Sequence, residues 1–141
     1  MKKKIHKLDF KLDFDYDVIA ISSHENDYRL CWAINQNMKL DLSKDEDLHI
    51  NIKNKELVQN FSVYSSNDEE NEIKYELIAC TSENGFLFNK FKNIDYILKV
   101  SGETDADLLK QLNVKLNKID IIIASYIVDN LTKTEMKKLM F

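Results

Sequence analysis

Proline is absent from the 141-residue sequence, and there are only two glycines and two cysteines. Without these usual markers of turns and helix ends, the boundaries of the elements must be inferred from the spacing of apolar residues. Cys31 and Cys80 form no C-x-x-C pair and have no histidine at zinc spacing, which argues against a zinc site. Both cysteines have apolar neighbours, so we interpret them as reduced residues of the core.

The sequence also lacks a long apolar segment and an excess of basic residues. Its most apolar stretch, residues 119–128, is too short to span a bilayer and contains Asp120. The basic residues 2–4 are followed by alternating charged residues, not by the apolar core of a signal peptide. A net charge of −4 argues against tight electrostatic binding to nucleic acid or to a membrane. We therefore expect a soluble cytoplasmic protein with no membrane contact.

Alternation of apolar and polar residues predicts several β-strands. The segments with this pattern are residues 8–16, 48–52, 61–63, 73–79, 94–100 and 119–128, with a short extended piece at 18–21. The acidic segment 65–72 predicts a hairpin turn. We expect one α+β domain over residues 1–141, built on a mostly antiparallel sheet of about six strands with helices packed on one face.

Helical spacing predicts two main helices and a short C-terminal one. Ser22 and Glu25 have the spacing of a capping box, which predicts that the first helix begins there and ends near Lys39. Thr132 and Glu135 predict the start of the C-terminal helix in the same way. The buried faces are predicted to carry Leu30, Cys31, Ile34 and Met38 in the first helix and Leu108, Leu109, Leu112 and Leu116 in the second.

No motif of a catalytic, cofactor or metal site is found in the sequence. There is no G-x-S-x-G, P-loop or G-x-G-x-x-G pattern. Asp13, Asp15 and Asp17 resemble the start of a calcium loop, but Val18 and His24 occupy the positions that require glycine and glutamate. We therefore predict no catalytic residues, no cofactor and no metal.

The acidic turn has two interpretations. Asp68, Glu69, Glu70 and Glu72 are close enough in sequence to hold a divalent cation or to bind a basic partner. Charged hairpin turns exposed to water are much commoner than functional ones. We favour the solvated turn.

The first helix has an apolar arc wider than one packing face. His24, Tyr28 and Trp32 are spaced at i, i+4 and i+8, beside the predicted core stripe, whereas Arg29 lies on the opposite, wet side. In one interpretation, Tyr28 and Trp32 pack beneath a loop, and we favour it because large aromatic residues mostly serve the core. In the other interpretation, the three residues form a partner face, because tryptophan and tyrosine are enriched at binding hot spots.

Residues 21–32 (ISSHENDYRLCW), 64–77 and 85–100 resemble, in this order, the IPExxxVDY family of Bacteroidetes. The positions that carry the resemblance include Ser22, Ser23, His24, Asp27, Tyr28, Arg29, Leu30, Cys31, Gly85, Phe86, Ile94, Asp95 and Tyr96. The second half of the namesake motif is present as Ile94-Asp95-Tyr96, whereas its I-P-E half falls on Phe88-Asn89-Lys90. In the half of the motif that is present, we expect Tyr96 to lie in the core and Asp95, on the opposite face, to bind a backbone group. The resemblance implies a cytoplasmic bacterial protein and carries no activity with it.

Three functional hypotheses follow. We favour a non-catalytic protein-interaction or accessory domain that holds a partner, or a second copy of itself, through His24, Tyr28 and Trp32 or through an open sheet edge. The alternative is an RNA-associated housekeeping factor, suggested only because the resemblance implies genes near those for ribonuclease III and fatty-acid synthesis. An enzyme of unknown class is the least favoured hypothesis, for want of a motif.

Overall fold

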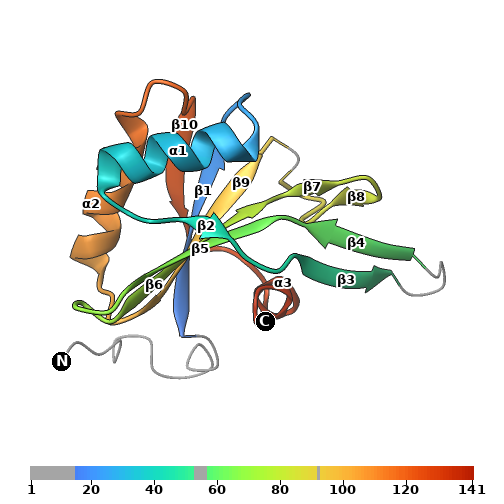
Figure 1. Ribbon diagram of the computed structural model, residues 1–141. Helices are drawn as coiled ribbons and strands as arrows, with labels where there is room; N and C mark the ends of the chain where they lie inside the picture. Colours follow the sequence, from blue (N-terminus) through green and yellow to red (C-terminus); the bar gives the residue numbers. More distant parts are fainter. Residues whose placement is uncertain (1–14, 53–56, 92) are drawn as a thin grey trace.

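The computed structural model describes residues 15–52, 57–91 and 93–141, and its central feature is a six-stranded antiparallel sheet (Figure 1). In spatial order the strands are β10 (Ala124–Val128), β1 (Tyr16–Ser22), β9 (Tyr96–Gly102), β6 (Ile73–Ala79), β5 (Val63–Asp68) and β2 (Ser43–Lys44). Long strands pair in the centre, for example with Ile19 opposite Leu98 and Leu98 opposite Leu77. The predicted α+β class with a mainly antiparallel sheet is confirmed.

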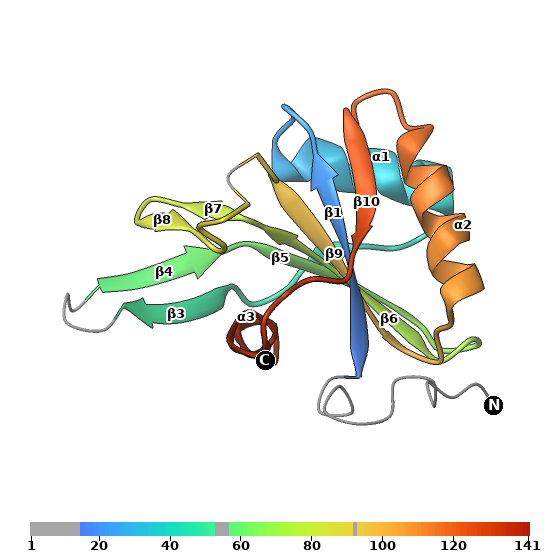
Figure 2. The same ribbon diagram turned by 180° about the vertical axis from the view of Figure 1, so that it is seen from behind.

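Three helices and two small hairpins complete the described fold. The helices are α1 (Asp27–Met38), α2 (Ala106–Asn117) and α3 (Lys133–Lys138). The hairpins are β3 (Leu48–Ile52) with β4 (Leu57–Phe61), and β7 (Thr81–Ser82) with β8 (Gly85–Phe86). Figures 1 and 2 show α1 and α2 together on one side of the sheet and α3 away from them.

The sheet is covered on both faces, so the prediction that helices pack on one face only is wrong. On the first face, Leu30 and Ile34 of α1 and Leu112 of α2 pack against the strands. On the second face, Leu139, directly after α3, joins a separate core with Ile97. Because β6 and β9 place apolar residues on both faces, each face buries its own apolar surface.

The first helix begins later than its predicted capping box. Ser22 is the last residue of β1, and Asn26 is the N-cap, with its Oδ1 accepting a 2.8 Å hydrogen bond from the backbone N–H of Arg29. Serine at 22 therefore has the right spacing but no helix to cap. The predicted end at Lys39 is confirmed.

The C-terminal part of the chain differs from prediction at one boundary. The capping box of Thr132 and Glu135 is confirmed, with both of its hydrogen bonds present. The predicted strand at 119–128 is shorter, because the chain first makes turns in which Ile119 and Ile122 are buried, and only β10 is extended. The predicted strand at 8–16 lies outside the described residues except for its last two positions.

Candidate functional site

The outer side of α1 carries exposed aromatic residues. Tyr28 is 77% exposed and Trp32 is 63% exposed, and His24, just before the helix, is also exposed. The interpretation that Tyr28 and Trp32 pack beneath a loop is therefore wrong. The reason is that Leu30, on the inner side of α1, is fully buried together with its apolar neighbours, so this side alone makes the contact with the sheet. We call His24, Tyr28 and Trp32 the aromatic face.

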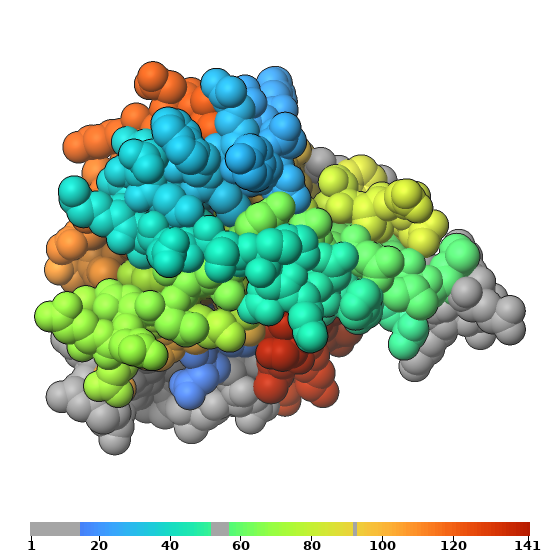
Figure 3. Space-filling model, viewed as in Figure 1, coloured from blue at the N-terminus to red at the C-terminus, as the bar shows by residue number. Residues whose placement is uncertain are grey.

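Helix geometry places Tyr28 and Trp32 side by side. Residues four apart on an α-helix lie one above the other, with about 5–6 Å between their Cβ atoms. In the space-filling view, α1 lies across the front of the molecule (Figure 3). Arg29, next to the aromatic face, is bound in an exposed ion pair at 3.2 Å with Glu25. This part of the helix therefore offers two aromatic side chains with a paired charge beside them.

A hydrogen-bonded network fixes the start of α1 to the sheet. The backbone N–H of Ser23 donates to the Asp95 carboxylate at 2.9 Å, and the Ser23 hydroxyl donates to the carbonyl of Ile121 at 2.7 Å. The Tyr96 hydroxyl donates to the carbonyl of Glu25 at 2.7 Å. Because Ser23 and Tyr96 are buried, these bonds hold the residues before α1 in one geometry.

The positions of the family resemblance separate into groups in space. Ser22 joins the network at the start of α1, since its hydroxyl donates to the carbonyl of Asn93 at 2.9 Å. Gly85 and Phe86 lie apart from it, in the β7–β8 hairpin. The remaining apolar positions, Leu30, Cys31 and Ile94, are buried in the two cores. The expectation that Asp95 binds a backbone group agrees with its contact to Ser23.

A tyrosine of the sheet connects α1 with an acidic loop. Burial and a hydrogen bond with Asp27 raise the pKa of Tyr64 to about 12, and the charge of Asp47 adds to this shift. The ammonium group of Lys44 lies 5.9 Å from the centre of the Tyr64 ring and 2.6 Å from the Asp47 carboxylate. The sequence did not predict this cluster, because its members come from α1, β2, β5 and the loop after β2.

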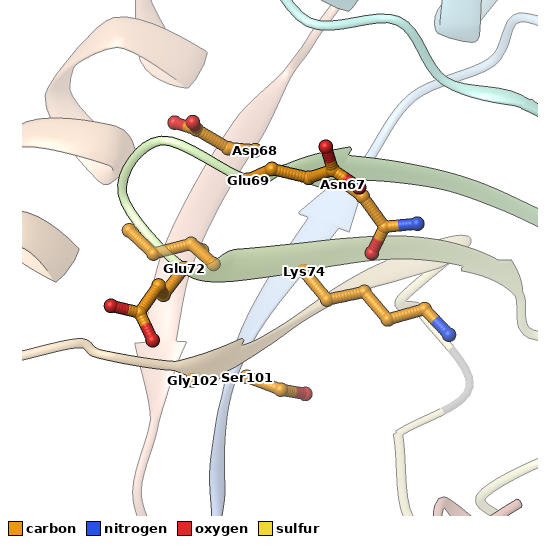
Figure 4. A pocket seen from close by; sticks show the side chains of 8 residues that line it. Asn67, Asp68, Glu69, Glu72, Lys74, Ser101 and Gly102 are labelled. Atoms are coloured by element: carbon orange, nitrogen blue, oxygen red, sulfur yellow. The ribbon is translucent and has the colours of Figure 1, made fainter.

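An open hollow lies beside the acidic turn between β5 and β6. Its volume is about 650 Å³, and its lining includes Asp68, Glu69, Glu72, Lys74 and Gly102. Figure 4 shows the acidic side chains pointing in different directions, with that of Lys74 extending away from them. Within the part of the chain that the structure describes, no group of acidic, histidine or cysteine residues could hold a metal ion. The turn is exposed and polar, as the favoured interpretation expects.

A buried ion pair lies on the second face of the sheet. The Lys99 ammonium is 3.5 Å from the Glu76 carboxylate and donates to the carbonyl of Leu139 at 2.5 Å. It also lies 4.7 Å from the ring centre of Tyr16 and 4.6 Å from that of Phe141. Burial lowers the pKa of Lys99, although Glu76 acts in the opposite direction. Since the ammonium is enclosed on all these sides, we assign it a structural role.

The two cysteines are free and buried. Burial raises the pKa of both thiols to about 12, so neither is a thiolate at neutral pH. Among the described residues, no helix has the length and apolar character needed to cross a membrane. Comparison of the chain with protein-family models, with curated proteins and with solved structures finds no match.

Proposed function

We propose that this protein is a non-catalytic interaction domain that binds another protein through the aromatic face of α1. The observation that carries the proposal is the exposure of Tyr28 and of Trp32, the only tryptophan in the sequence, on neighbouring turns of one helix. Single exposed apolar residues are normal on a protein surface. Two adjacent large aromatic side chains match the residue types that dominate binding hot spots.

The attachment of α1 supports the same proposal. Binding costs free energy for every side chain and segment that must be ordered, so a rigid surface binds better than a flexible one. The hydrogen bonds of Ser23, Asp95 and Tyr96 hold the start of the helix, and Leu30 and Ile34 hold its inner side. The aromatic face is thus presented by a helix that is already fixed. In this view, the polar positions of the family resemblance serve to orient the helix.

Membership of the IPExxxVDY family, with a cytoplasmic location, belongs to the same proposal and is supported by the resemblance of residues 21–32, 64–77 and 85–100. The RNA-associated alternative has less support at this face, because residues 24–47, which carry the aromatic pair, have a net charge of −3. The enzyme alternative also has less support, since the large hollow beside the acidic turn has no convergent polar groups.

The proposal is tested by affinity purification from the native cell. Tagged wild-type protein is compared with a Tyr28→Ala/Trp32→Ala variant and with a Val114→Ala control, in which an apolar side chain that is 53% exposed on α2 is removed. We expect a specific protein partner that the wild type and the control retain and the double variant loses. All samples are also prepared with nuclease.

Two results would contradict the proposal. A partner retained equally by the double variant would place binding elsewhere, and a captured component that disappears with nuclease would favour the RNA alternative. Because Tyr28 and Trp32 are exposed, we expect the double variant to change the free energy of unfolding by less than about 1 kcal/mol. Thermal unfolding followed by circular dichroism checks this.

A further inference from the structure

We infer that the aromatic face binds a basic protein segment, with an arginine or lysine side chain placed over the rings of Tyr28 and Trp32. This inference rests on the proposed function and adds the chemistry of the partner. It follows from the net charge of the segment that carries the face and from the ion pairs that Arg29 and Lys44 already form.

The segment that carries the face is acidic. Residues 24–47 contain six acidic and three basic residues, a net charge of −3 out of −4 for the whole chain. Figures 1 and 3 show α1 and the segment around β2 on the same side of the molecule. The contact of Tyr64 with Asp27 and its proximity to Lys44 and Asp47 join the two elements into one surface. A partner must therefore approach an acidic surface.

Most of the positive charge on this surface is already paired. Arg29 binds Glu25 at 3.2 Å, and Lys44 binds Asp47 at 2.6 Å. Asp41 and Glu46 are exposed, and no described cation lies within ion-pair distance of either carboxylate. A basic partner would therefore find unpaired carboxylates on the segment that carries the face.

The aromatic rings suit the same ligand. A guanidinium or ammonium group within about 6 Å of a ring centre is attracted by the negative face of the ring, most strongly for tryptophan. Carboxylates around the rings add long-range attraction and repel acidic partners. Lys44 over the Tyr64 ring, at 5.9 Å, shows this contact within the surface itself. A nucleic acid is negatively charged, like this surface, and would be repelled.

The test uses Trp32 as its own reporter, since no other tryptophan contributes to the emission. The probes are helical peptides of about 15 residues that share one leucine-bearing face. The other positions carry arginine in the first peptide, lysine in the second and glutamate in the third. A single-stranded oligouridine is the fourth probe. We expect a saturable change in Trp32 emission with arginine and lysine only, at concentrations up to about 1 mM, and weaker binding as salt is raised.

A matched pair of variants tests the role of the carboxylates. Asp41→Asn/Glu46→Gln removes two exposed charges from the segment that carries the face, whereas Glu69→Gln/Glu70→Gln removes two exposed charges from the β5–β6 turn. We expect the first variant to bind the arginine peptide several-fold more weakly than the second. The inference is overturned if the glutamate peptide or the RNA binds as well as the arginine peptide. Absence of any saturable change, or equal affinity in the two variants, also overturns it.

The two proposals fail in different ways. If a partner purified from the cell depends on Trp32 but ignores both salt and Asp41→Asn/Glu46→Gln, the inference about a basic segment fails and the proposed function stands. If that partner is retained without Tyr28 and Trp32, the proposed function itself fails.

Discussion

Buried thiols and partly buried phenols, among them Cys31, Cys80 and Tyr64, make this protein sensitive to alkaline pH. Burial raises the pKa of Cys31 and Cys80 from 9.0 to about 12, and burial together with Asp27 raises that of Tyr64 from 10.0 to about 12. Below pH 9 these groups are protonated in both the folded and the unfolded chain, so their contribution to stability is fully present. As pH rises towards 12, the unfolded chain loses protons that the folded chain keeps, and the contribution is lost.

We therefore expect the free energy of unfolding to fall between pH 9 and about 12. Lys99 acts in the opposite direction, because burial lowers its pKa. Between the lowered pKa and the ordinary one, the unfolded chain binds a proton that the folded chain has lost, so this group makes the folded state more stable as pH rises. Thermal unfolding across this pH range measures the slope. In a Cys31→Ala/Cys80→Ala variant the slope should be shallower, whatever the absolute loss from the cavities. An unchanged slope would show that the thiols do not set the alkaline sensitivity.

Because glycine is scarce, other residues occupy backbone conformations that glycine adopts most easily. Both glycines have positive φ, 125° at Gly85 and 103° at Gly102, where other residues would be strained. At Gly102, a Cβ atom would lie 2.1 Å from the carbonyl oxygen of Glu72. Two further left-handed positions are occupied by Lys39 at the end of α1 and by Glu72 in the β5–β6 turn. Within the described residues, two left-handed positions are thus occupied without the residue that adopts them most easily.

At the scale of elements, the start of α1 is fixed both by a local N-cap and by hydrogen bonds to the sheet. The Asn26 side chain accepts a hydrogen bond from the backbone N–H of Arg29, one of the free N–H groups in the first turn of the helix, as good N-cap residues do. The residues before it are held by Asp95 and Tyr96 of the sheet. The position of the aromatic face depends on both.

Replacing Asn26 with alanine removes the cap but leaves the contacts to the sheet. We expect Asn26→Ala to lower the free energy of unfolding by about 1 kcal/mol, measured by urea denaturation. Asn26→Asp keeps a side-chain acceptor and should cost much less. If alanine and aspartate have the same effect, the cap does not define the start of the helix.

At the scale of the whole molecule, the pair of Glu76 and Lys99 joins the central strands to the C-terminal segment. Lys99 contacts a carboxylate of the neighbouring strand, the carbonyl of Leu139 and the ring of Phe141. Tyr16 reinforces this connection, since its hydroxyl donates to the carbonyl of Met136. Removing Lys99 leaves the buried Glu76 carboxylate with only one described cation, the more distant and exposed ammonium of Lys74, at 3.7 Å.

We expect Lys99→Met to lower the free energy of unfolding by about 3–5 kcal/mol and to make the segment after α3 more accessible to proteases. Lys74→Met, which removes an exposed cation that also faces Glu76, should cost less than about 1 kcal/mol. The double variant Glu76→Met/Lys99→Met should recover much of the loss, because no unpaired charge remains. A Lys99→Met variant as stable as Lys74→Met would contradict a structural role for the pair.

Much of the fold was predictable because it depends on local spacing. The stripe of Leu30, Cys31 and Ile34, the hairpin with its acidic turn and the cap at Thr132 follow from short-range patterns. The capping box at Ser22 had the correct spacing and was wrong, because the chain there is still extended in β1. Competition between a strand and a helix for the same residues is decided by tertiary contacts.

The candidate site shows the same division. The sequence by itself determined that Tyr28 and Trp32 share one side of a helix, because that depends only on helical periodicity. Only the tertiary structure decided that this side is exposed, since Leu30 and Ile34 already fill the contact with the sheet. The second covered face, with Glu76 and Lys99 buried at positions that alternation assigns to water, was also decided by folding. Period and propensity act over a few residues, whereas burial depends on which distant segments come to cover them.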